Sequence, residues 1–215
     1  INEPSNFRAS WFGEDKSGNV YAFDNTLKKI LAYSGNGSIT ALEDFDYFVD
    51  ITTEYGFLNQ DFSGVIDDGL YFAEKTESGL VVRIYSADSF KKVREYVIEC
   101  SNPEMIRLSR NGKYAAVTTV YGDTGNERMI TLFDGQNGEK IKSIELTESY
   151  LSDVGDYNRI SFVSSEGKLI LSYGNDSAVL CDLINKVELK PLDTLLAVCC
   201  DFGDGIICIN TDKSE

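Results

Sequence analysis

Histidine is absent from the 215-residue chain. Its absence removes the commonest general base, together with the Ser-His-Asp and Cys-His arrangements of nucleophilic catalysis. The chain also lacks a C-x-x-C pair, so the usual ligand sets of a zinc site are missing. The cysteines are odd in number: Cys100, Cys181, Cys199, Cys200 and Cys208. Such thiols are typical of small buried side chains in a reducing compartment, and we expect a cytoplasmic location.

Long apolar runs and clustered bases are also missing. No segment approaches the roughly 18 apolar residues of a membrane span, and no basic region followed by an apolar core opens the sequence. There are 20 Lys and Arg against 35 Asp and Glu, a net charge of −15. This disfavours nucleic-acid and anionic-membrane partners, because phosphate binding draws on clustered Lys and Arg. We interpret the charge mainly as a source of solubility and secondarily as a preference for basic partners. The chain begins with Ile1 rather than Met, so we expect a processed chain or a piece of a longer protein.

The most regular stretch of the sequence lies between Glu104 and Leu146. Asn111-Gly112 and Asn137-Gly138 each stand between β-prone runs, which is a strong signal for a tight hairpin turn. The four predicted strands are Met105–Ser109, Lys113–Val120, Met129–Phe133 and Lys140–Leu146. Four antiparallel strands in about 45 residues have the size of one β-propeller blade.

Similar strand motifs recur along the chain at measurable intervals. The motifs YAFD, RIYS, TLFD and VLCD, which we assign to the third strand of each blade, end at Asp24, Ser86, Asp134 and Asp182. Their successive intervals are 62, 48 and 48 residues. The two equal intervals indicate a repeat, and the longer first interval predicts an insertion at residues 39–61.

The segment SGNVYAFDNTLKKILAYSGNGSI, residues 17–39, resembles the repeat of quinoprotein-like and WD-type β-propellers. The Trp-Asp and Gly-His signatures of WD repeats are absent; Phe23-Asp24, Phe133-Asp134 and Cys181-Asp182 stand in the places of Trp-Asp. A quinoprotein dehydrogenase would hold a quinone against a tryptophan with calcium. Here Trp11 is the single tryptophan and lies in an ordinary strand position. The resemblance therefore implies the blade and not the enzyme.

We therefore predict an all-β fold, a β-propeller of four-stranded antiparallel blades with about four blade-equivalents. Because propellers more often have six to eight blades, we expect this chain to form part of a larger ring. Residues 1–215 are predicted to form a single, partial propeller domain. The predicted blades are residues 7–34, 62–99, 104–146 and 158–190, with the start of another at 195–210.

Residues Ile30 to Glu74 contain nine acids and no Lys or Arg. Aromatic residues beside acids offer apolar anchors in a negative field, which suits a peptide that carries Lys or Arg. The same pattern also arises when aromatics fill a blade core and acids face solvent. Spacing there fits both helix and strand, and we favour a strand with a long loop. The candidate protein-binding residues are Asp44, Phe45, Asp46, Tyr47, Phe48 and Asp50.

Other candidate chemistry is weaker. Two loops rich in Asp, Asn and Gly, residues 123–127 and 153–158, lack the ligand spacing of an EF-hand and match ordinary turn composition. No glycine-rich phosphate-binding motif is present. We assign no catalytic, cofactor-binding or metal-binding residue and expect no cofactor.

The predicted function is a non-enzymatic propeller module for protein recognition or sensing, a scaffold within a larger multidomain protein or complex. Its partner would be a protein or another domain of the parent chain, with a preference for basic surfaces. The alternative is a ligand-binding or enzymatic propeller whose central-channel site is completed by blades outside this chain.

Overall fold

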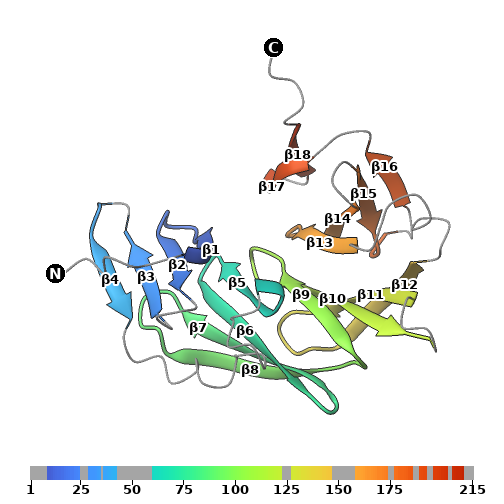
Figure 1. Ribbon diagram of the computed structural model, residues 1–215, viewed down its shortest axis with the longest axis horizontal. Coiled ribbons are helices and arrows are strands. Elements are labelled where there is room, and N and C mark those ends of the chain that lie inside the picture. The colour runs from blue at the N-terminus through green and yellow to red at the C-terminus, as the bar shows by residue number, and fades with distance from the viewer. Residues whose placement is uncertain are drawn as a thin grey trace. The chain divides into compact units, whose positions relative to one another are not determined.

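A computed structural model describes residues 9–24, 29–34, 36–42, 60–122, 127–146, 158–173, 177–185, 189–192, 196–202 and 205–210. These residues form four antiparallel sheets of four strands each and one two-stranded sheet. Within every four-stranded sheet the strands are adjacent in chain order, as Figure 1 shows for β9 to β12. The predicted meander of the blades is therefore confirmed.

The first two sheets are each formed by four consecutive strands. The first sheet contains β1 (Ala9–Glu14), β2 (Val20–Asp24), β3 (Lys29–Tyr33) and β4 (Ile39–Leu42). A 3-10 turn, η2 (Gln60–Phe62), precedes the second sheet. The second sheet contains β5 (Ser63–Ile66), β6 (Gly69–Thr76), β7 (Gly79–Ser86) and β8 (Lys92–Glu99).

The remaining strands follow the same order. The third sheet contains β9 (Pro103–Leu108), β10 (Tyr114–Tyr121), β11 (Glu127–Asp134) and β12 (Lys140–Leu146). The fourth contains β13 (Asn158–Val163), β14 (Lys168–Tyr173), β15 (Ser177–Asp182) and β16 (Leu189–Leu192). The two-stranded sheet pairs β17 (Leu196–Phe202) with β18 (Gly205–Asn210). No helix among the described residues has the length and apolarity to cross a bilayer.

The third sheet matches the strands predicted from the Asn-Gly signals to within two residues at each end. Gly112 and Gly138 have positive φ values of 66° and 80°. A residue without a Cβ adopts this conformation at little cost, which explains why each turn carries a glycine. Both predicted turns are confirmed.

The assignment of the YAFD motif as a third strand is wrong. Its residues belong to β2, the second strand of the first sheet, because β1 supplies the first strand. The turns after the third strands begin instead at Ser34, Ser86, Asp134 and Asp182. These positions are 52, 48 and 48 residues apart, so the repeat is more regular than the motif count indicated. Residues 43–59, most of the predicted insertion, lie outside the described residues, and the insertion stays a prediction.

The turn between the first and second strands is built in the same way in three sheets. It begins at a buried polar residue: Asp15, Ser109 or Ser164. The backbone carbonyl of each accepts a hydrogen bond from a positive-φ glycine three residues later. Each side chain also accepts a backbone N–H, from Asn19, Tyr114 and Lys168 respectively. The buried oxygen is therefore satisfied within its own turn, as burial of a polar group requires.

Contacts divide the chain into two compact units, and residues of the second sheet belong to both. The first unit comprises residues 1–74 and 82–95, and the second comprises residues 75–81 and 96–215. In the first unit, Tyr21 and Ile30 of the first sheet pack with Leu70 and Phe72 of β6. Phe90 lies edge-on to the ring of Tyr21, with ring centroids 6.3 Å apart.

In the second unit the third and fourth sheets pack through one face. The third sheet contributes Met105, Ala116, Ile130, Leu132 and Leu146. The fourth contributes Ile160, Val163, Leu169, Leu171, Cys181 and Leu183. Each large apolar side chain buried in this way stabilises the folded state by about 1.5–3 kcal/mol relative to exposure. Neither sheet could bury this face alone, so the two stabilise each other.

Candidate functional site

The predicted protein-binding residues Asp44, Phe45, Asp46, Tyr47, Phe48 and Asp50 lie outside the described residues. They follow β4 in the chain, and their role stays a prediction. In the part of the chain that the structure describes, no three His, Cys, Asp or Glu side chains are grouped so that they could hold a metal ion.

The described residues of the second unit form an open cleft of about 440 Å³ beside the start of β9. Three segments build it: the turn between β6 and β7, the connection from β8 to β9, and the facing ends of β9 and β10. The lining residues are Lys75, Thr76, Glu77, Cys100, Asn102, Pro103, Glu104 and Val120. A concave site with both apolar and polar groups is the usual form of a ligand-binding surface.

Backbone hydrogen bonds hold the three segments together. The N–H of Cys100 donates to the carbonyl of Ser78, over 3.3 Å, and so ties the β8–β9 connection to the β6–β7 turn. The N–H of Val120 donates to the carbonyl of Asn102, over 3.1 Å. The segments that form the cleft are thus held in place by backbone hydrogen bonds to one another.

Asn102 is one of two described non-glycine residues with positive φ, at 45°. Asparagine tolerates this left-handed conformation better than most residues, and Pro103 after it disfavours a helical continuation. The Asn102 side chain is exposed, and its amide forms no hydrogen bond with a described residue. The cleft therefore presents an amide on a backbone that is held in place.

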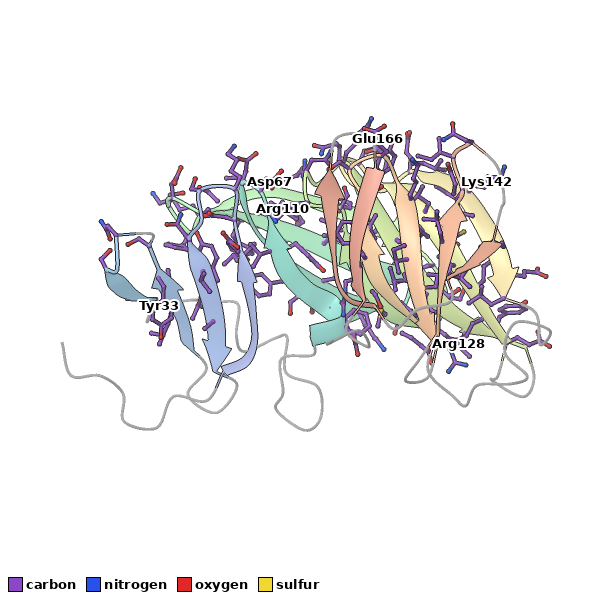
Figure 2. The ribbon with its side chains drawn as sticks, turned by 90° about the horizontal axis from the view of Figure 1, so that it is seen from above. Tyr33, Asp67, Arg110, Arg128, Lys142 and Glu166 are labelled. Carbon is purple, nitrogen blue, oxygen red and sulfur yellow. The ribbon has the colours of Figure 1, made fainter. Side chains whose placement is uncertain are left out.

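Charge in the cleft is partly compensated. The Arg128 guanidinium donates two hydrogen bonds to the Glu104 carboxylate, from Nε over 2.8 Å and from Nη2 over 3.2 Å. This bidentate geometry is the strong form of an Arg–carboxylate pair. Lys75 adds a positive charge to the lining, and Glu77 is exposed and forms no ion pair with a described residue. Figure 2 shows Arg128 at the opposite end of the sheets from Arg110 and Glu166.

Cys100 is half-buried in the cleft, and burial raises its pKa to about 11. At neutral pH the thiol is therefore protonated, which makes it a poor nucleophile and a small apolar surface. Together with Pro103 and Val120 it forms the apolar part of the cleft lining.

Sequence reasoning missed this cleft. The Ser-Asn-Pro run at residues 101–103 was a turn signal, but turn composition alone does not show that three separate segments meet there. The arrangement has polar groups for binding, namely the Asn102 amide and the Glu77 carboxylate, beside apolar surface. Its only described thiol is in the unreactive form.

No protein-family model matches the chain. No curated protein matches it either. Solved structures do. Hsv2 of Kluyveromyces lactis matches with a TM-score of 0.50 at 13% identity, over 84% of this chain and 51% of that one. Hydrazine synthase of Kuenenia stuttgartiensis matches with a TM-score of 0.47 at 15% identity, over 94% and 55%. A nidogen/laminin complex matches with a TM-score of 0.49 at 13% identity, over 93% and 70%.

The likeness to Hsv2, a β-propeller protein, and the four successive four-stranded sheets show that the chain has a β-propeller fold. This confirms the predicted fold class. The chain spans about half the length of the first two of these proteins. At these identities the likeness concerns the fold alone, and propellers as a class commonly serve as binding scaffolds.

Proposed function

We propose that the chain is a non-enzymatic propeller module that recognises another protein, or another domain of its parent chain, through loops at one end of its blades. The observation that carries the proposal is the open cleft beside β9, whose lining combines apolar side chains with an amide and charged groups. Rigid sheets that position variable connections are the usual basis of recognition surfaces. We further propose a cytoplasmic protein, with these blades forming part of a larger ring.

Charge supports a basic partner. The chain carries a net charge of −15, and the acidic aromatic stretch Asp44, Phe45, Asp46, Tyr47, Phe48 and Asp50 adds a second candidate surface. Electrostatic complementarity raises the association rate and disfavours acidic partners, even where it adds little affinity. The alternative is a ligand-binding or enzymatic propeller whose channel site is completed by blades outside this chain. No described residue specifically supports it.

Peptide binding at two salt concentrations tests the proposal. The probes are two fluorescein-labelled 12-residue peptides, one alternating Lys with Val and one alternating Glu with Val, at about 0.05 M and 0.3 M salt. We expect the Lys peptide alone to bind, with an affinity that falls as salt rises. Charge reversal of Asp44, Asp46 and Asp50 to Lys should weaken binding about tenfold, because an ion pair at a protein surface typically contributes about 0.2–1 kcal/mol.

The matched control reverses three exposed acids of the second unit, Glu139, Glu145 and Glu166, to Lys. It changes the net charge by the same amount at residues that are distant in the sequence. An equal loss of affinity in both variants would mean that net charge alone governs binding. The acidic aromatic stretch would then not be the binding site. Equal binding of the Lys and Glu peptides would contradict recognition of basic partners.

A further inference from the structure

We propose that Asn36 is the site at which the folded chain preferentially deamidates, through attack by the backbone nitrogen of Gly37. This inference goes beyond the proposed function and does not depend on a binding partner. Asparagine is a thermolabile residue, and a following glycine leaves the attacking nitrogen least hindered because glycine has no Cβ. The chain contains three such pairs, and the structure distinguishes them: Asn36-Gly37, Asn111-Gly112 and Asn137-Gly138.

The reaction needs only the two residues of the pair and water. The Gly37 nitrogen bonds to Cγ of Asn36, the Cγ–Nδ2 bond breaks, and ammonia leaves with the proton that the Gly37 nitrogen loses. Water then opens the cyclic imide at either carbonyl, which gives aspartate or isoaspartate at position 36. Both products carry a new negative charge, and isoaspartate also inserts a methylene into the main chain between β3 and β4.

The turn at Asn36 is held by its own hydrogen bonds. The Gly37 N–H donates to the Ser34 carbonyl over 2.9 Å, and the Ser34 N–H donates to the Ser38 carbonyl over 3.0 Å. The Ser38 N–H donates to Oδ1 of Asn36 over 3.0 Å. Among the described residues, every hydrogen bond of these four residues stays within the turn. Asn36 and Gly37 are exposed, and a Cβ at Gly37 would meet nothing within 4 Å.

The turn at Asn111 is bonded to two other turns. The Gly112 carbonyl accepts the side-chain amide of Gln136 over 2.8 Å. Nδ2 of Asn111, the nitrogen that deamidation releases, donates to the Ser165 carbonyl over 3.3 Å. Gly112 is also buried, so its nitrogen is shielded. Ring closure at this pair therefore requires bonds to the turns between β11 and β12 and between β13 and β14 to break.

The turn at Asn137 is held by packing and by a neighbouring turn. Asn137 is exposed, as Asn36 is, so exposure alone does not separate the two. Gly138, however, lies against β8, where a Cβ would be 2.1 Å from the carbonyl oxygen of Val97. Two residues before Asn137, the Gly135 N–H donates to the Lys113 carbonyl over 2.7 Å. This turn cannot open without disturbing other segments.

The rate at each pair follows the ease of local opening. In the folded chain each glycine N–H is bonded within its turn, so the attacking nitrogen becomes free only when the turn opens. Openings that break fewer contacts cost less free energy and are populated more often. The Asn36 turn loses only its own bonds, whereas the other two also lose contacts with other segments. We expect Asn36 to react about tenfold faster than Asn111 or Asn137, which is the effect of one or two hydrogen bonds.

The test follows deamidation of the whole 215-residue chain at physiological temperature and mildly alkaline pH. Peptide mapping by mass spectrometry at successive times gives the rate at each Asn-Gly pair. A parallel incubation in urea removes the protection that the fold provides, and there the three rates should be similar. Dividing each rate in urea by the rate in the folded chain gives the protection. We expect protection to be about tenfold smaller at Asn36 than at the other two pairs.

A variant tests whether bonds between turns cause the protection. Gln136→Ala removes the bond to the Gly112 carbonyl, so it should raise the rate at Asn111 up to about fivefold and leave the rate at Asn36 unchanged. The matched control Lys142→Ala removes an exposed side chain from β12 and should change none of the three rates. Urea midpoints of both variants show whether each remains folded under the incubation conditions.

Equal protection of the three pairs, or a faster reaction at Asn111 or Asn137 than at Asn36, would overturn the inference. So would an unchanged rate at Asn111 in folded Gln136→Ala, because the bonds between turns would then not be what protects this pair. Preferential reaction at Asn36 together with the faster reaction at Asn111 in the variant would support it. None of these results depends on peptide binding, so the proposed function is tested separately.

Discussion

The two ends of the third sheet differ in how much of their surface is already committed. At one end, the turns after β9 and β11 are linked by the Gly135 N–H, which donates to the Lys113 carbonyl over 2.7 Å. The Gln136 side chain adds a bond to the carbonyl of Gly112, over 2.8 Å. We call this the tight-turn end. At the other end, the cleft exposes the Asn102 amide and the Glu77 carboxylate.

This difference separates the scaffold from the recognition surface. At the tight-turn end, side chains that shape the turns, such as Ser109 and Gln136, bond to their own turns or to the turns beside them, while charged side chains such as Glu139 and Glu166 stay exposed. At the cleft end, backbone bonds fix the segments while side chains stay available. A rigid scaffold that presents uncommitted side chains at one end is what recognition requires.

The largest effect is expected at the tight-turn end, from Gly138→Ala. A Cβ at this position would lie 2.1 Å from the carbonyl oxygen of Val97, at a φ of +80°. Backbone cannot move aside as a flexible side chain can, so we expect a loss of about 3 kcal/mol or more in the free energy of unfolding. Urea denaturation of the variant and the wild-type chain measures it.

Gly37→Ala is the matched control for crowding. Gly37 has nearly the same φ, +82°, in the corresponding turn of the first sheet, but a Cβ there meets nothing within 4 Å. It should therefore cost about 1 kcal/mol, the left-handed penalty alone. Equal losses in the two variants would show that the tight-turn end is not specially close-packed.

The sequence predicted the tight-turn end well and the cleft end poorly. Asn111-Gly112 and Asn137-Gly138 are local signals, because the positive φ of each glycine is encoded within its own turn. The cleft depends on Ser78 and Cys100, 22 residues apart, meeting through a backbone hydrogen bond. No local pattern encodes that contact.

The wrong assignment of the YAFD motif to a third strand has a related cause. VYAFD and TLFD share composition, but composition does not record strand order within a sheet. The structure identifies VYAFD as β2 because β1 precedes it and pairs Trp11 with Phe23. The true markers of the repeat are the turns that begin at Ser34, Ser86, Asp134 and Asp182, whose small polar side chains are common in turns and gave a weaker signal.

A smaller loss of stability is expected for Asp15→Asn, in the turn between β1 and β2 of the first sheet. Asp15 is 2% exposed and accepts hydrogen bonds from the backbone of Ser17 and Asn19 and from the side chains of Asn19 and Tyr21. Burial opposes its ionisation, but these bonds outweigh burial and lower the pKa of Asp15 below its ordinary 3.8. At pH 7 the variant should lose about 1–2 kcal/mol, because an amide cannot accept all four.

The sign of the pH dependence follows from the lowered pKa. The ionised Asp15 stabilises the fold fully above the ordinary carboxyl value, and that contribution is lost as the pH falls through the lower folded value. The stability gap between wild type and Asp15→Asn should therefore narrow below about pH 3.8. Urea midpoints from pH 7 to pH 3 measure it. A gap that stays constant over this range would mean that the carboxylate is not the stabilising species.

The smallest effect is expected at the cleft end, from Asn102→Gly. Glycine adopts the φ of 45° without strain but has more freedom in the unfolded chain, and these two effects nearly cancel. The side-chain amide has no described hydrogen bond to lose. The free energy of unfolding should therefore change by less than about 0.5 kcal/mol. The contrasting variant Asn102→Val also removes the amide but places a β-branched residue at positive φ. It should lower the free energy of unfolding by about 1–2 kcal/mol. A large loss in the glycine variant would show that the amide stabilises the fold, and the contrast between the two ends of the sheet would disappear.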